Sequence, residues 1–424
     1  MNILEAILFF HRLFQLCNLT QLGLDKPTWS AIKSRPLKIY SFVILLFSLA
    51  ILIEGIVNPN LKGKYAGDVG VTVDYIQLIG VRTAYIVCVI EALCHVKEQQ
   101  ALLKNVQEID RIFEVSLNTD VENRKFRSKI IKNGLVMLIV YFFCECFILA
   151  ITALRSTSIY IGFWILYTVP LLVCGVRYFQ YLLFIDIIKQ RFVKLNEVLR
   201  SVNLLNAIYK SGHHKFLGRG QAAFKLVKTT DKYSKTMYRD GFDLTKLLVI
   251  RDLYSRLWEV CTLVNKCFGL SILIAIGVDF LAITANFYWI FLNFKKFSSS
   301  YGDIFRIASS VFWSMPHLYN VVKLAIMCHT TIETTSEIAL GVHRIQVDLF
   351  NDNHNSLIEQ FSLQLLHQKI HFTAFGFFSI DCSLLYTIVG ATTTYLIILI
   401  QFHMSEQRDV SSKAFQKVIA NITQ

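Results

Sequence analysis

The chain has 424 residues, of which 54% are hydrophobic and 17% are charged, and its formal net charge is +13. Soluble domains carry about 25% charged residues, so this composition excludes an ordinary soluble protein and indicates a membrane protein. Phe (33) and Tyr (18) are abundant, which suits lipid contact and interfacial aromatic belts, and the scarcity of Pro (5) permits long helices.

The N-terminal segment 1–38 is predicted to lie in the cytoplasm. Its opening stretch, 1–10, is apolar but lacks the basic region and the small-residue cleavage site of a secretory signal peptide. Its continuation to Leu16 predicts a short amphipathic helix at the inner membrane surface.

Seven segments satisfy the length of roughly 20 apolar residues that a membrane-crossing helix needs. They are 39–57, 71–93, 135–154, 161–188, 267–294, 304–328 and 372–402. The seventh is too long for one crossing, and polar residues interrupt it at 379–383. We therefore expect a lower half-helix followed by a spanning helix over 384–404, with a tail over 405–424.

The connecting segments have helical character. Apolar residues recur at intervals of three and four in 95–132, 192–205 and 244–264, and 329–371 continues the sixth span and returns to the seventh. Such helices below a membrane must bury their apolar stripes on one another, which predicts a cytoplasmic bundle. The insert 211–241 is rich in Lys and Gly, and we expect it to be poorly ordered.

Orientation follows from the Lys and Arg residues of the loops. The N-terminal segment and the even-numbered connections hold 31 of them, against 8 in the other connections and the tail. If the long fourth connection is discounted, 15 remain against 8. The sequence therefore predicts an all-α membrane protein with seven spans, a cytoplasmic N-terminus and an external C-terminus.

Several function classes find no support in the sequence. A G-protein-coupled receptor has the opposite orientation, and the net positive charge is explained by cytoplasmic loops, so no nucleic acid is expected as a partner. We find no nucleophile elbow, zincin motif or P-loop, and therefore expect no enzyme, no cofactor and no metal. The cysteines fall in spans or inner loops, which disfavours a disulfide framework.

The end of the seventh span carries the most specific pattern. Thr394 and Tyr395, five apolar residues, and then Gln401 and Phe402 complete the apolar run. Thr394 and Gln401 are seven residues apart and share a helix face with Ile398. A polar amide in lipid needs a partner or a wet cavity, so this face suits either a neighbouring helix or a pore.

This pattern closely resembles the C-terminal signature of insect gustatory receptors. The resemblance implies a tetramer whose last helices line a central cation pore, with Gln401, Phe402, Ile398, Thr394 and Tyr395 at the pore or gate. It also implies a small-molecule tastant as ligand, contact with membrane lipid, other receptor subunits as partners, and the sensory-neuron plasma membrane as location.

The resemblance leaves the ligand class and the subunit's role open. The sugar-receptor group has an acidic residue after the Thr-Tyr pair, whereas this chain has Leu396, so a bitter or other non-sugar ligand is expected. A sugar-sensing member, an obligate co-receptor that forms no pore alone, and a transporter are the alternatives.

A ligand cavity is expected in the outer half of the membrane. Its candidates are charged residues within spans and aromatic residues at similar depth, namely Tyr75, Arg82, Trp164, Tyr167, Asp279, Tyr288 and Trp313. Cavities for small ligands are apolar and aromatic with few polar groups. Interhelical pairing near the interfaces is the more common explanation of such charges, and interfacial belts explain many of the aromatic residues.

Overall fold

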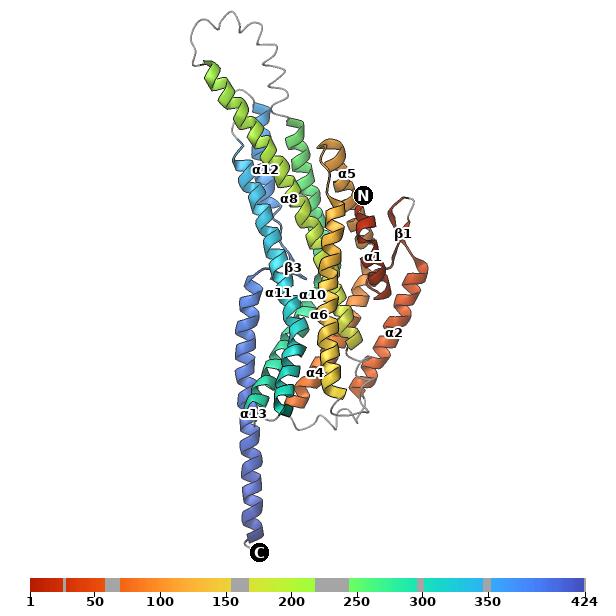
Figure 1. The fold of residues 1–424 in the computed structure, drawn as a ribbon, viewed down its shortest axis with the longest axis vertical. Coiled ribbons are helices and arrows are strands. Elements are labelled where there is room, and N and C mark those ends of the chain that lie inside the picture. Colours follow the sequence, from red (N-terminus) through yellow and green to blue (C-terminus); the bar gives the residue numbers. More distant parts are fainter. Residues whose placement is uncertain are drawn as a thin grey trace, which may run out of the picture.

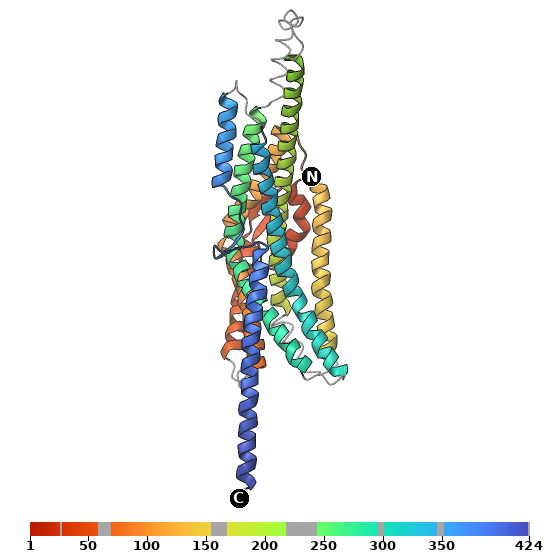
Figure 2. The same ribbon diagram turned by 90° about the vertical axis from the view of Figure 1, so that its left-hand side faces the viewer.

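The computed structural model describes residues 1–25, 28–57, 69–153, 168–217, 244–295, 301–345 and 352–422. Within them the chain is almost entirely helical, and the long helices run side by side in an elongated bundle (Figures 1 and 2). The seven longest elements of the apolar part are α2 (Arg35–Val57), α4 (Val69–Cys94), α6 (Asn123–Ala153), α8 (Val169–Leu217), α10 (Leu244–Lys295), α11 (Tyr301–His343) and α13 (Ser383–Ile422).

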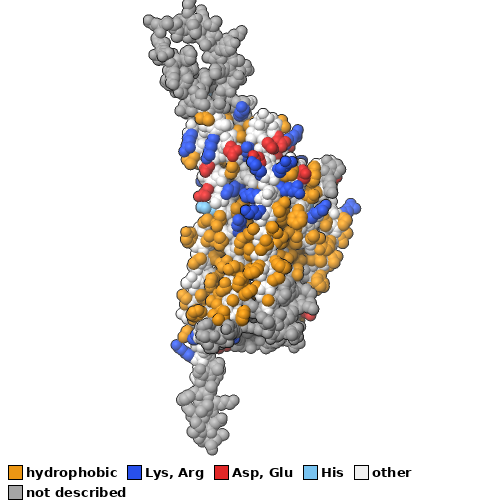
Figure 3. Space-filling view, in the orientation of Figure 1, with side chains coloured by type: hydrophobic (Ala, Val, Ile, Leu, Met, Phe, Trp, Pro, Cys, Tyr) orange, Lys and Arg blue, Asp and Glu red, His pale blue; other side chains and the backbone are white. Residues whose placement is uncertain are grey.

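On the face drawn in Figure 3, an apolar belt covers the part of the bundle toward the C-terminus, and charged side chains gather at the other end. Six described helices are long and apolar enough to cross a membrane: α2, α4, α6, α8, α10 and α13. The remaining helix, α11, falls short because polar residues such as His317 and Asn320 lie within its apolar stretch. Both are buried, so they lower its hydropathy without facing lipid.

The charged end is a bundle of helices, as the apolar periodicity predicts. It consists of α5 (Val96–Ser116), α12 (Asp352–His367) and the ends of α8, α10 and α11 that extend beyond the apolar belt (Figure 1). The stripe of α5 that includes Leu102, Val106 and Ile109 is buried. The insert 211–241 is expected from its composition to be poorly ordered. Its residues 211–217 continue α8, and its remainder falls within 218–243, which lie outside the described residues.

The predicted amphipathic helix at the N-terminus is α1 (Ile3–Leu16). Its apolar face packs into the bundle, where the rings of Phe10 and Phe179 lie 4.7 Å apart. A hairpin of β1 (Leu22–Asp25) and β2 (Ser30–Lys33) follows, and His11 Nε2 donates to the carbonyl of Leu22 at 2.8 Å. The sequence analysis did not predict this hairpin.

The prediction of a half-helix at the start of the seventh region, from residue 372, is wrong. Residues 373–379 form a small hairpin, with β3 (Thr373–Ala374) paired to β4 (Phe378–Ser379). Phe375 and Gly376 at its turn have φ of +52° and +79°, values that end a helix and are typical of a tight hairpin turn. The break at 379–383 lies where the polar residues predict it, because α13 begins at Ser383.

The end of α13 also differs from the expectation of a short tail. The helix continues through Ile422, so its 40 residues measure about 60 Å, roughly twice the thickness of a hydrocarbon core. In Figures 1 and 2, α13 extends well beyond every other helix. Gln401 and Phe402 therefore mark the end of its apolar part, and the rest protrudes.

Candidate functional site

A buried polar cluster lies in the apolar belt, where α8, α10 and α11 meet. One carboxylate oxygen of Asp279 lies 2.7 Å from His317 Nδ1, and the other accepts the hydroxyl of Tyr178 at 2.7 Å. All three residues are buried. The carboxylate holds the proton on Nδ1, which leaves Nε2 as the free position of the ring. That buried Nε2 has no hydrogen-bond partner among the described residues.

The cluster borders a small cavity. Its lining comes from α4, α8, α10 and α11 and consists of Val81, Ala84, Leu171, Cys174, Tyr178, Ala275, Val278, Asp279 and Asn320. Its volume of about 10 Å³ is close to that of one water. An organic ligand therefore needs the helices to separate, or enters from an adjoining recess.

Such a recess lies between α6 and the start of α8. It measures about 500 Å³ and is lined almost entirely by apolar side chains, with Glu145 as its charged residue. Glu145 accepts a hydrogen bond from Thr168 at 3.2 Å. Tyr141 lines the recess and accepts from Asn320, which lines the small cavity, so Tyr141 stands between the two spaces.

The structure brings few of the predicted ligand residues together. Of the five described candidates, Asp279 alone lines the small cavity, and none lines the recess. Arg82 donates instead to the carbonyl of Ile51 on α2 at 3.4 Å, and Tyr288 is fully buried near His403 of α13. The remaining two, Tyr75 and Trp313, are partly exposed, and Trp164 and Tyr167 lie outside the described residues.

The sequence analysis missed His317, Tyr178 and Tyr141, which the structure places around Asp279. A polar residue at an isolated position of an apolar segment was the available signal for His317. Tyr178 and Tyr141 carried none, because an aromatic residue at such a position is equally typical of a packed core.

A second buried cluster connects α4, α8 and α10. Arg177 and Glu91 form an ion pair with an N–O distance of 2.8 Å, and both side chains are almost fully buried. Glu91 also accepts the backbone N–H groups of Leu270 and Ser271 on α10, at 2.9 and 3.2 Å. The pair therefore fixes α10 at this level.

The hairpin before α13 rests on this same part of α10. A Cβ atom at Gly269 would lie 3.1 Å from both the backbone N and the Cα of Phe375, so any larger residue would require the hairpin backbone to shift by a few tenths of an ångström. Asn265 adds hydrogen bonds, since its amide donates to the carbonyl of His371 and its oxygen accepts from the N–H of Thr373. These contacts connect α10 near Gly269 to the segment that enters α13.

One face of α13 is left open in the single chain. Thr394, Ile398, Gln401 and Phe402 are exposed, Phe402 to 62%, and Tyr395 is exposed on one side while its ring packs on Phe280. The hydroxyl of Thr394 is satisfied within the helix by the carbonyl of Gly390. The amide of Gln401 has no hydrogen bond to any described residue. The shared face predicted from the spacing of 394 and 401 is thus an open one.

Exposure alone does not separate this face from a lipid-facing one, because α2 is equally open. The composition of the two faces distinguishes them. From residue 42 to residue 53 the exposed residues of α2 are all apolar, among them Phe42, Val43 and Phe47, and the exposed Glu54 follows near the end of the helix. Those of α13 alternate between apolar residues and Thr387, Thr393, Thr394 and Gln401.

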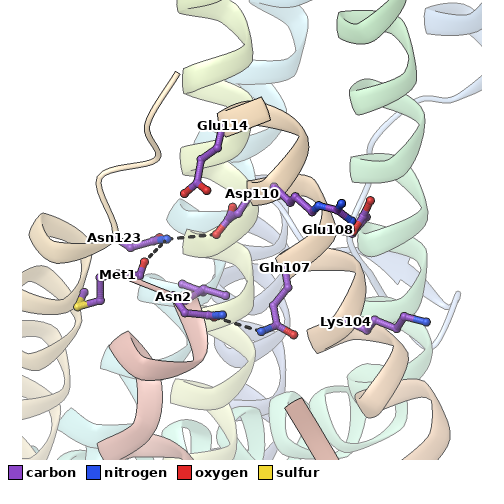
Figure 4. A pocket seen from close by; sticks show the side chains of 10 residues that line it. Met1, Asn2, Lys104, Gln107, Glu108, Asp110, Glu114 and Asn123 are labelled. Carbon is purple, nitrogen blue, oxygen red and sulfur yellow. Dashed lines mark hydrogen bonds and ion pairs between the residues drawn. The ribbon is translucent and has the colours of Figure 1, made fainter. Parts of the chain in front are cut away.

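A polar hollow of about 480 Å³ lies at the other end of the molecule, between α1, α5 and the start of α6 (Figure 4). Asn123 donates to the carbonyl of Met1 and to Asp110, and Gln107 donates to Asn2. Asp110 is also paired with the buried guanidinium of Arg191 at 2.8 Å. These bonds hold the N-terminus against the bundle. The polar residues that line the hollow therefore have a structural role, and no ligand is needed to account for them. No metal-type cluster of His, Cys, Asp or Glu occurs in the part of the chain that the structure describes.

Comparison with known proteins identifies related sequences and folds. The profile of a family described as 7tm Chemosensory receptor matches residues 7–406. Gustatory receptor 2a of Drosophila melanogaster is 37% identical over 436 residues, covering 96% of this chain and 98% of the relative.

Solved structures resemble the fold over nearly the whole chain. The olfactory receptor OR5 of Machilis hrabei aligns with a TM-score of 0.66 at 13% identity, covering 94% of this chain and 98% of that chain. Its complex with eugenol aligns with a TM-score of 0.63 at 14% identity, covering 94% and 99%.

Proposed function

The chain belongs to the seven-transmembrane chemosensory receptor family, among its gustatory receptors, and on this premise we propose that it is a subunit of a ligand-gated, non-selective cation channel. The observation that carries the proposal is the open face of α13, where polar side chains alternate with bulky apolar ones. A polar amide such as that of Gln401 is costly on a helix face that contacts lipid, whereas it is favourable on a face that borders water.

The proposed assembly is a tetramer in which four copies of α13 surround a central axis. One helix cannot enclose a channel, but a ring of four presents Gln401 and Phe402 to the axis at the outer end of the apolar segment. Rings of bulky apolar side chains close a pore by dewetting, and polar rings allow hydrated ions to pass. A small rotation of α13 exchanges Phe402 for Gln401 at the constriction.

The proposed membrane is the plasma membrane of sensory neurons, with the N-terminus in the cytoplasm. The excess of Lys and Arg in the N-terminal segment and the even-numbered connections supports this orientation. The charged helical bundle then faces the cytoplasm, and the protruding end of α13 lies outside.

The proposed ligand site is the space around Asp279, His317 and Tyr141. It combines an apolar lining with few polar groups, and the free Nε2 of His317 is available to a ligand hydroxyl. The complex of a structural neighbour with eugenol supports a small organic molecule as the kind of ligand. Because Leu396 follows the Thr-Tyr pair, we propose a bitter or other non-sugar tastant.

Ligand binding opens the pore only if the open state binds more tightly. The proposed route runs from Asp279 along α10 to Gly269, which lies ten residues away on the same helix. From there the close contact with Phe375 leads through the hairpin into α13.

Replacing Asp279 with Asn tests the ligand site. We expect the half-maximal concentration of agonist to rise roughly tenfold, because the amide no longer fixes the proton on His317 Nδ1. The measurement is a concentration–response curve of whole-cell current at matched surface expression. Asp252→Asn, on the exposed end of the same helix, is the control and is expected to respond as the wild type. An unchanged response of Asp279→Asn to every agonist would remove Asp279 from the site.

Expression of this chain alone in a naive cell line tests the function itself. Whole-cell current is recorded during exposure to sugars and bitter compounds while G-protein signalling is blocked. Cation current under these conditions supports a homomeric channel and names its ligand class. Silence at confirmed surface expression favours an obligate co-subunit or an untested ligand, and current that returns with a second receptor subunit would identify an obligate partner.

A further inference from the structure

A groove runs along α6, α8 and α11 at the border between the apolar belt and the charged end. Its upper part measures about 350 Å³ and is lined by lysines, including Lys125, Lys129, Lys189 and Lys194. Its lower part is a shallow crease of about 30 Å³ with mostly apolar walls. Asp186 lines both parts, so the two parts adjoin at this residue. Figure 3 shows Lys and Arg side chains gathered along this border.

The lower part is shaped by apolar side chains and ends in one cation. Phe179 and Leu182 of α8 face Tyr319 and Met327 of α11, and Lys323 lies between the latter two in sequence. Lys323 is half-buried, and it has no ion-pair partner among the residues that the structure describes. A lysine at this depth extends along apolar surface and carries its ammonium toward the polar border.

The cations of the groove outnumber its anions. Three lysines are matched one to one, because Lys129 pairs with Asp186 at 2.7 Å, and Glu122 and Glu197 pair with the two lysines nearest them in sequence. Lys189 donates to the hydroxyl of Thr330 at 2.7 Å and forms no ion pair with a described residue, although Asp186 and Glu333 attract its charge. Among the residues that line the groove, Lys189 and Lys323 therefore leave a surplus of two positive charges.

Lys189 and Lys323 lie on opposite sides of the groove, about two helical turns apart along its length. Lys189 belongs to α8 and reaches across to Thr330 of α11, and Lys323 precedes Thr330 by seven residues on that helix. Seven residues correspond to two turns, about 10 Å, along one helix face. An anion between these levels is within reach of both flexible lysine side chains.

We propose that the groove binds one anionic glycerophospholipid of the adjacent leaflet. Its phosphate lies between Lys189 and Lys323, and its acyl chains follow the apolar wall of α8 and α11. A soluble anion would make no use of the apolar crease, and a zwitterionic lipid has no net charge to match the surplus. Under the proposed orientation this leaflet is the cytoplasmic one, where anionic lipids are abundant. The inference rests on that membrane placement and does not require channel activity.

The test uses purified full-length protein and its thermal unfolding in detergent with added lipid. Phosphatidylserine is expected to stabilise the wild type, since a ligand that binds only the folded state raises its melting temperature. Phosphatidylcholine and the soluble headgroup glycerophosphoserine are expected to have no such effect. The double variant Lys189→Gln/Lys323→Gln is expected to bind phosphatidylserine roughly thirty-fold more weakly, because each lysine near the surface contributes to attraction of anionic lipid.

The matched control is Lys97→Gln/Lys104→Gln, which removes the same charge from the exposed face of α5. It is expected to respond as the wild type. Asp186→Asn removes the anion within the groove and is expected to strengthen phosphatidylserine binding, which keeps the test decisive if the double variant fails to fold. Equal binding by the wild type and the double variant, or equal stabilisation by glycerophosphoserine, would overturn the proposal. Neither result bears on whether the chain conducts ions.

Discussion

Replacing Phe402 with Ala is expected to produce a standing cation current several-fold above the wild-type baseline in the absence of agonist. The physical reason is that Phe402 is the largest apolar side chain at the end of the open face of α13, and a ring of four such side chains dewets the pore. Without the four phenyl groups the constriction is wider and fills with water. The measurement is basal whole-cell current, normalised to surface expression.

The control for Phe402 is Phe42 on α2. The two rings are exposed to similar extents, 62% and 55%, but the exposed residues of α2 around Phe42, from residue 42 to residue 53, are all apolar. Phe42→Ala is therefore expected to leave the basal current unchanged. Gln401→Leu is expected to lower conductance without raising basal current, because it removes a polar ring from the permeation path. If well-expressed variants at 401 and 402 both conduct as the wild type, these residues do not form the gate.

Replacing Glu91 with Gln is expected to be the most destabilising of the conservative substitutions considered. It leaves the guanidinium of Arg177 buried without its anion, and breaking a buried ion pair from one side costs about 3–5 kcal/mol. It also weakens the acceptor for the backbone N–H groups of Leu270 and Ser271. Surface expression and the thermal stability of the detergent-solubilised protein should both fall sharply.

Two variants separate the effect of burial from the effect of the ion pair itself. Glu91→Met/Arg177→Met removes both charges and is expected to recover much of the lost stability, because no unpaired charge remains. Asp252→Asn breaks an ion pair of nearly the same length, 2.7 Å, between exposed residues, and is expected to change stability by less than about 1 kcal/mol. A mild Glu91→Gln phenotype, close to that of Asp252→Asn, would show that this pair does not fix α10.

The sequence predicted the helices well because their signal is local. Twenty apolar residues specify a helix in a membrane whatever their neighbours are, since every backbone polar group must be satisfied within the segment. The stripes of α5 and of the extended ends of α8 and α10 were equally readable, because their apolar period of three to four residues is a property of one helix alone. The shared face of Thr394 and Gln401 belongs to the same class of prediction.

The hairpin at 373–379 shows where this reasoning fails. An apolar stretch rich in Phe is compatible with a helix, and the sequence analysis predicted one. The structure has a hairpin turn instead, with positive φ at Phe375 and Gly376, and the backbone of Phe375 lies against Gly269, more than a hundred residues earlier. A contact of this kind has no signature in the local sequence.

The charged and polar residues within the spans follow the same division. The sequence alone determined that Arg82, Glu91, Arg177 and Asp279 lie in the apolar belt, where a charge must have a partner or a wet surface. Only the tertiary structure decided the partners: Arg177 for Glu91, His317 and Tyr178 for Asp279, and the carbonyl of Ile51 for Arg82. Hydropathy is a sum over neighbours in the chain, whereas pairing depends on how the helices rotate and slide against one another. That arrangement is fixed by packing of the whole bundle.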